Sequence, residues 1–157
     1  MQVNFYETID DALLRFAVIV SKANGKWVFC KHKERDTYEV AGGHRENGET
    51  ILQAAKRELT EETGAVRFQI KPICVYSVIG KTRANESGEE SYGMLYYADI
   101  EEFEKELHSE IEKIELFDEL PDKWTYPQIQ PLLLAEVERR LQTDCVKTNS
   151  NEWSDNG

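Results

Sequence analysis

Cysteine is scarce in this chain, and its three cysteines lie far apart. Cys30, Cys74 and Cys145 form no C-x-x-C pair, and none has a cluster of histidines beside it. Disulfide-rich and zinc-binding domains usually carry paired cysteines at short spacings. The sequence therefore argues against a disulfide framework and a structural zinc site, and we expect three core or surface thiols.

Long apolar runs are also missing. Nowhere do eighteen apolar residues follow one another, and residues 1–11 lack the apolar stretch of a signal peptide. We therefore expect a soluble, cytoplasmic protein with no membrane partner. With 40% hydrophobic residues among 157, the chain can bury one compact core. We place a single domain at residues 1–143 and a polar, flexible tail at residues 144–157.

Positive charge is in short supply. Lysine and arginine number 19 against 30 acidic residues, which gives a formal net charge of −11. Affinity for nucleic-acid backbone comes largely from basic side chains that displace counterions, so long duplex nucleic acid is not an expected partner. A small polyphosphate remains compatible with this charge, because bound divalent cations would reverse the local field around acidic groups.

Apolar periodicity and turn residues predict a mixed α/β chain. An Asn24-Gly25 turn between two apolar runs is typical of a hairpin. Helical patterns cover residues 50–63 and begin again near Pro131. Strands are expected at residues 15–21, 27–31, 37–40, 66–79, 91–100 and 111–116. This order fits an α/β/α sandwich with a mixed sheet between helices.

Residues 43–65 carry the most informative pattern, with four glutamates, an arginine and two glycines at fixed spacing. Glu58, Glu61 and Glu62 stand at i, i+3 and i+4, so a helix places them on one face. Like charges so placed repel one another, and a divalent cation would relieve that repulsion. Carboxylate oxygens suit Mg²⁺ or Mn²⁺. The sequence therefore predicts that this helix forms one wall of a metal site.

The pattern resembles the signature of the Nudix family, G-x5-E-x7-R-E-U-x-E-E-x-G-U, where U is a bulky aliphatic residue. Ala65 is smaller than the usual last residue. The resemblance implies the α/β/α Nudix fold and an enzyme that hydrolyses a nucleoside diphosphate linked to another group, X, by attack of water on phosphorus. The matching residues are Gly43, Glu49, Arg57, Glu58, Leu59, Glu61, Glu62 and Gly64.

The resemblance also implies roles for the residues of the metal site. Glu61 and Glu62 are expected to be metal ligands, and Glu58 either a ligand or the base that accepts the proton of water. A backbone carbonyl at Gly42 or Gly43 is a further expected ligand, since glycine allows close approach.

Other residues of the signature are expected to support this site. Glu49 and Arg57 should form an ion pair that ties the preceding loop to the helix. Gly43 and Gly64 should shape the two ends of the segment. A glutamate from a distant loop often completes Nudix sites, and Glu110 is the first candidate. The alternatives lie in the long polar loop: Glu86, Glu89 and Glu90.

Substrate contacts are less sharply indicated. His44, Lys81 and Arg83 could reach a phosphate, whereas His32 and His108 are expected on the surface. Base-stacking side chains would come from aromatic residues of the strands, although most of these should belong to the core. The aromatic candidates are Trp27, Phe29, Tyr38, Tyr76, Tyr92 and Tyr96.

The substrate expected from the resemblance is a nucleoside triphosphate. Several residues after the signature the chain has Pro72, and then no proline until Pro121. The proline that accompanies ADP-ribose hydrolysis is therefore missing. The default is the MutT-like group, which converts triphosphates such as 8-oxo-dGTP to monophosphate and pyrophosphate, although Ala41 replaces a common proline. The alternatives are an RNA 5′-triphosphate pyrophosphohydrolase and a non-catalytic nucleotide-binding regulator. Many relatives are dimers, so a homodimer stays open.

Overall fold

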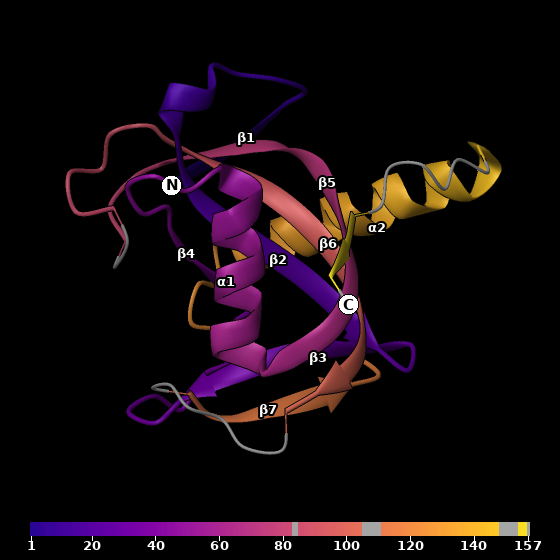
Figure 1. The fold of residues 1–157 in the computed structure, drawn as a ribbon. Helices are drawn as coiled ribbons and strands as arrows, with labels where there is room; N and C mark the ends of the chain where they lie inside the picture. Colours follow the sequence, from indigo (N-terminus) through magenta and orange to yellow (C-terminus); the bar gives the residue numbers. More distant parts are fainter. Residues whose placement is uncertain (83–84, 105–110, 148–153, 157) are drawn as a thin grey trace.

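The computed structural model describes residues 1–82, 85–104, 111–147 and 154–156. These residues form a mixed sheet of eight strands with a helix on each side (Figure 1), and the predicted α/β/α sandwich is confirmed. The elements in chain order are β1 (Gln2–Tyr6), the 3₁₀ turn η1 (Asp11–Leu13), β2 (Leu14–Ala23), β3 (Lys26–His32), β4 (Ala41–His44), α1 (Ile51–Thr63), β5 (Ala65–Ile79), β6 (Ser91–Phe103), β7 (Ile111–Phe117), α2 (Gln130–Lys147) and β8 (Ser154–Asn156).

The sheet follows the order β1-β5-β6-β2-β3-β7, with β4 paired to β2 and β8 paired to β5. Strands β2 and β6 are parallel, and the other described pairs are antiparallel. The predicted hairpin is β2–β3, and its turn residues Asn24 and Gly25 both have positive φ, as a type I′ turn requires. The antiparallel pair expected from the two long apolar stretches is β5–β6.

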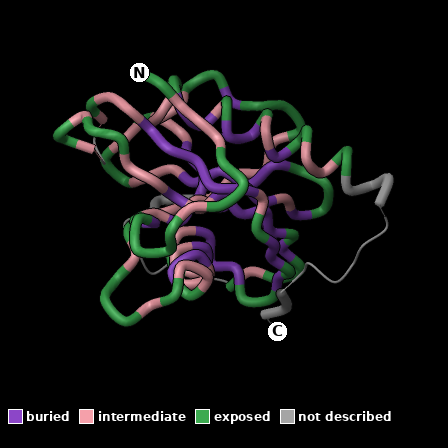
Figure 2. The backbone as a smooth tube through the Cα atoms, turned by 90° about the horizontal axis from the view of Figure 1, so that it is seen from above, coloured by how far each residue is buried: buried purple, intermediate pink, exposed green. Residues whose placement is uncertain are grey.

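Alternate residues of β2 face opposite sides of the sheet. Ala17 and Ile19 pack in the cluster under α1, whereas Val20 packs in the cluster under α2. Helix α1 contributes Ala54, Ala55 and Leu59, and α2 contributes Leu133, Leu134 and Val137. Buried stretches follow the central strands, and exposed stretches follow the connecting loops (Figure 2).

Helix α1 begins and ends close to the predicted boundaries. The Thr50 hydroxyl accepts a hydrogen bond from the Gln53 N–H (3.1 Å), and the Gln53 side chain accepts one from the Thr50 N–H (2.9 Å). This reciprocal pair is a capping box. Gly64 closes the helix with φ 78°, and its N–H donates to the carbonyl of Thr60. The predicted metal-binding residues therefore stand on a helix fixed at both ends.

Two strand predictions were incomplete. The strand expected at residues 37–40 was misplaced, since Tyr38 and Glu39 form only isolated bridges and β4 is Ala41–His44. Glycine is unfavourable in strands, so the sequence around Gly42 and Gly43 did not indicate a strand there. Pairing with β2 stabilises this strand. Strand β1 was not predicted. It pairs with residues Val75–Ile79 of β5, which lie far from β1 in the sequence.

The described residues of the predicted tail, 144–147 and 154–156, belong to regular elements. Helix α2 continues beyond residue 143 to Lys147, and β8 pairs with Phe68–Ile70 of β5. Cys30 and Cys74 are buried free thiols, as expected, while the side chain of Cys145 lies outside the described part. No described helix is long and apolar enough to cross a bilayer.

Candidate active site

The glutamates of α1 have different environments. Glu58 and Glu62 are largely buried, with 13% of each side chain exposed, whereas 53% of the Glu61 side chain is exposed. Glu62 Oε1 accepts a hydrogen bond from the Gly42 N–H at 2.7 Å. The helix and β4 thus face each other across a layer of carboxylates.

The two glycines of β4 leave room where any side chain would collide. A Cβ on Gly43 would lie 2.4 Å from the carboxyl carbon of Glu58, and one on Gly42 would lie 2.8 Å from the carbonyl oxygen of Ala17. The close contacts at these glycines are with Glu58 and with the neighbouring strand. A ligand role for the Gly42 carbonyl stays a prediction.

Arg57 joins the loop before α1 to the helix. Its Nε and Nη2 donate to the two carboxylate oxygens of Glu49 at 2.7 and 3.0 Å, so the predicted ion pair is present and is bidentate. Nη2 also donates to the carbonyl of His44, and Nη1 donates to Glu58 at 2.7 Å and to Glu61 at 3.4 Å. One guanidinium therefore contacts the loop, the end of β4 and two glutamates of α1.

Burial makes the ionised forms of Glu58 and Glu62 costly. It raises the pKa of Glu58 to about 7, with Arg57 opposing the shift and the charges of Glu62 and Glu61 adding to it. Burial also raises the pKa of Glu62, against contacts with His32 and the Gly42 N–H. Two adjacent buried carboxylates that resist ionisation form an all-oxygen donor set suited to a hard divalent cation. The residues therefore fit a divalent cation.

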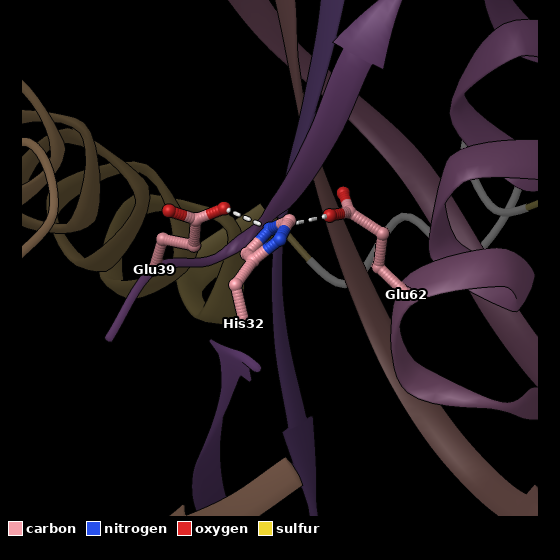
Figure 3. Close-up of side chains that lie close together, drawn as sticks. All are labelled: His32, Glu39 and Glu62. Carbon is pink, nitrogen blue, oxygen red and sulfur yellow. Dashed lines mark ion pairs between the residues drawn. The ribbon is translucent and has the colours of Figure 1, made fainter. Parts of the chain in front are cut away.

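His32 is the main correction to the predicted site. It was expected on the surface, but only 18% of its side chain is exposed, and Nε2 lies 2.7 Å from Glu39 Oε1 and 3.5 Å from Glu62 Oε2 (Figure 3). Donor atoms of these three residues lie within 4.8 Å of one another. Sequence reasoning missed Glu39 as well. Both residues come from segments outside the signature, and only the strand arrangement brings them to α1.

A pocket of about 350 Å³ opens beside these carboxylates. His44 lies on its wall, and its ring packs 4.7 Å from that of Phe16. Among the aromatic candidates, Tyr76 lines the pocket, but like Trp27 and Phe29 it is buried in the core cluster under α2. The pocket is also lined by side chains from β2, the β3–β4 connection, α1, the segment before α2 and the first residue of α2, which include Phe16, Val18, Glu39, Glu62, Tyr126 and Gln130.

Several predicted residues lie elsewhere. Lys81 lines a smaller neighbouring cavity of about 170 Å³, and Arg83 and Glu110 lie outside the described residues. Glu90 accepts hydrogen bonds from Ser77 at 2.7 Å and from Tyr6 at 2.9 Å, which directs its carboxylate to the β1–β5 region. Glu90 is therefore occupied in a structural contact, and its candidacy for the metal site is weakened.

The chain belongs to the Nudix family. The family model described as the NUDIX domain matches residues 12–137, which include the whole helix α1 and the loop before it. The resemblance seen in residues 43–65 therefore extends over most of the chain.

Known relatives agree with this assignment. "Putative 8-oxo-dGTP diphosphatase YtkD" of Bacillus subtilis (strain 168) is 36% identical over 105 residues, 66% of this chain and 62% of that protein, so the match spans less than two thirds of YtkD. The Bacillus subtilis pyrophosphohydrolase BsRppH is 27% identical with a TM-score of 0.70, covering 87% of this chain and 90% of the other. A NUDIX hydrolase from Nitrosomonas europaea shares the fold at 23% identity and a TM-score of 0.60, covering 80% and 86%.

Proposed function

We propose that the protein is a divalent-metal-dependent pyrophosphohydrolase that converts a nucleoside triphosphate, with 8-oxo-dGTP as the representative substrate, to the monophosphate and pyrophosphate. The observation that carries this proposal is the pair of buried carboxylates, Glu58 and Glu62, packed against the glycines of β4, with Glu62 lining a pocket of about 350 Å³. Membership of the Nudix family supports the same chemistry.

Each residue of the site has a proposed task. Glu58, Glu61 and Glu62 hold the cations, with Glu58 also able to serve as the base that accepts a proton from the attacking water. Bound Mg²⁺ or Mn²⁺ supplies positive charge to the phosphate oxygens and lowers the pKa of water. Arg57 and Glu49 hold the loop and helix in register, and His44, which lines the pocket, contacts a phosphate of the substrate.

The proposed reaction is the hydrolysis of one phosphoanhydride bond. The water oxygen forms a new bond to phosphorus while the P–O bond that joins the α and β phosphates breaks, and the leaving group keeps the electron pair of that bond. The leaving group is pyrophosphate when the α phosphorus is attacked and the nucleoside monophosphate when the β phosphorus is attacked. The proton released by water passes to the carboxylate base. The products are a nucleoside monophosphate and pyrophosphate.

The choice of substrate rests on the relatives. The name of YtkD points to 8-oxo-dGTP, and the absence of an ADP-ribose mark after the signature agrees with a triphosphate. The structural likeness to BsRppH, a pyrophosphohydrolase, supports release of pyrophosphate. The second candidate substrate is 5′-triphosphate RNA. The net charge of −11 favours the small nucleotide over an RNA chain. A non-catalytic regulator is disfavoured, because all the glutamates of the signature are intact.

A substrate screen tests the proposal. The purified protein is incubated in Mg²⁺ or Mn²⁺ with dGTP, 8-oxo-dGTP, ADP-ribose, a dinucleoside polyphosphate and 5′-triphosphate RNA, and release of pyrophosphate, phosphate and monophosphate is measured. We expect the highest kcat/KM with 8-oxo-dGTP. Faster release of pyrophosphate from RNA would select the second candidate, and no turnover with any compound in either metal would overturn the enzyme assignment.

A further inference from the structure

A series of contacts between basic and acidic side chains joins the β3–β4 connection to α1. Arg35 Nη1 donates to Glu39 Oε2 at 3.1 Å, and Glu39 Oε1 lies 2.7 Å from His32 Nε2, which in turn lies 3.5 Å from Glu62 Oε2. At the far end, Glu62 Oε1 accepts the Gly42 N–H. Glu62 is therefore contacted at both carboxylate oxygens by groups from two different segments.

The side chains of His32, Glu39 and Glu62 are largely buried. Only 8% of the Glu39 side chain is exposed, and Glu39, His32 and Glu62 all border the main pocket. Without the imidazole between them, the carboxylates of Glu39 and Glu62 would face each other as like charges in a poorly hydrated space. The position of His32 between them, seen in Figure 3, allows both to stay in place.

Fixing the carboxylate has a physical benefit for cation binding. The last torsion of a glutamate is broad, and an ordered glutamate side chain gives up much of its rotamer freedom. The close contact with the Gly42 N–H and the longer one with His32 favour that order before a cation arrives, so binding has less of it to supply.

We infer that His32 and Glu39 are positioning residues that hold the carboxylate of Glu62 in its cation-binding orientation. We call these two residues the Glu62 brace. Neither residue belongs to the Nudix signature, which begins at Gly43. The inference rests on the proposed function, because it takes Glu62 to be a metal ligand.

The test compares two substitutions of His32 that are both uncharged and similar in length. His32→Gln keeps a side-chain N–H near the position of Nε2, whereas His32→Met removes it. Because both variants lose any imidazolium charge, their difference reports the donor alone. Mn²⁺ affinity is measured without substrate by calorimetry, and the metal concentration for half-maximal activity is measured separately.

We expect His32→Met to bind Mn²⁺ on the order of 10–100-fold more weakly than wild type, the usual cost of losing a partner of a metal ligand. His32→Gln should stay close to wild type, and the effect should fall on metal dependence more than on the KM for nucleotide. Asp36→Asn is the control, because Asp36 lies on the same connection and pairs with Lys123 at 2.9 Å on the surface; its Mn²⁺ affinity should not change.

Three results would overturn the inference. Equal affinities for the Met and Gln variants would mean that the donor is not used. Tighter binding by both would mean that the imidazole merely repels the cation. Loss of a whole equivalent of Mn²⁺ in both would make His32 a ligand.

A crystal structure of the wild-type protein with Mn²⁺ tests the brace even if a variant fails to fold. We expect His32 to remain between Glu39 and Glu62, and a direct bond from Nε2 to the ion would overturn the inference. These readouts need no turnover. A failed substrate screen with a clear Met–Gln contrast would therefore refute the proposed reaction and leave the brace standing.

Discussion

At the scale of single residues, the site separates glutamates that the sequence presents as equivalent. Glu58 and Glu62 are buried against β4, while Glu61 stays largely in solvent beside Arg57. The spacing i, i+3 and i+4 predicted one shared face but contained no information about how deeply each side chain is buried. Depth depends on which strand packs against the helix, and here that strand is β4 with its two glycines.

Glu61 offers a clean test of the catalytic role, because it contributes little buried surface. We expect Glu61→Gln to lower kcat about 100-fold or more, since a lost ligand removes several kcal/mol of charge stabilisation. Its midpoint of urea unfolding should remain that of wild type. Glu102→Gln is the matched control, with 54% of its side chain exposed and an ion pair to Arg67 at 3.5 Å. Unchanged turnover in Glu61→Gln would remove Glu61 from the site.

The adjacent glycines should respond differently to alanine. In Gly43→Ala the new methyl group meets the flexible end of Glu58, which can move, so we expect a large loss of kcat with a small loss of stability. In Gly42→Ala the methyl group meets backbone of β2, and crowding of this kind typically costs about 1–3 kcal/mol. Steady-state kinetics and urea unfolding of both variants check the contrast. The reverse ranking would mean that Glu58 is not held against Gly43.

At the scale of elements, local signals predicted local structure well. The Asn24-Gly25 turn and the capping residues Thr50 and Gly64 fix the hairpin and α1, because each acts within a few residues of its own position. The sequence could not place His32 beside Glu62, since that contact needs β3, its connection and α1 to be assembled. The same limit explains β1, whose pairing partner lies some seventy residues further along.

The link between the loop and α1 predicts a dependence of stability on pH. The Arg57 guanidinium lowers the pKa of Glu49 to about 2, from about 4.3 in an unfolded chain. A lowered pKa stabilises the fold above the unfolded value, and this stabilisation is lost as the pH falls toward 2. We therefore expect the stability difference between wild type and Glu49→Gln to be largest near pH 6 and to shrink below about pH 4.3. Urea unfolding across this range measures it, and a constant difference would contradict the assignment.

At the scale of the whole molecule, the excess of acidic groups and the buried carboxylates of α1 act together. A cation that binds only the folded state, present at a concentration of 100 times its Kd, stabilises that state by about 2.7 kcal/mol. For a chain of this length, this corresponds to a rise in Tm of roughly 5–10 °C. We expect Mg²⁺ or Mn²⁺ to produce such a rise relative to EDTA.

Two controls make the thermal experiment specific. Sodium chloride at matched ionic strength reports general screening of the net charge, and that part is subtracted. Glu61→Gln should show a smaller shift than Glu102→Gln. Equal shifts in the two variants would place the stabilising cation away from α1.

Strand β5 has a further consequence for how copies of this protein meet. Its outer edge is covered in two places by the chain itself, by β1 along Val75–Ile79 and by β8 along Phe68–Ile70. Pro72 lies between these stretches and has no N–H to offer another strand. Among the described residues, this long strand therefore presents no continuous open ladder. A second molecule could pair with that edge only after displacing β1 or β8, so β5 itself is not an open template for edge-to-edge pairing.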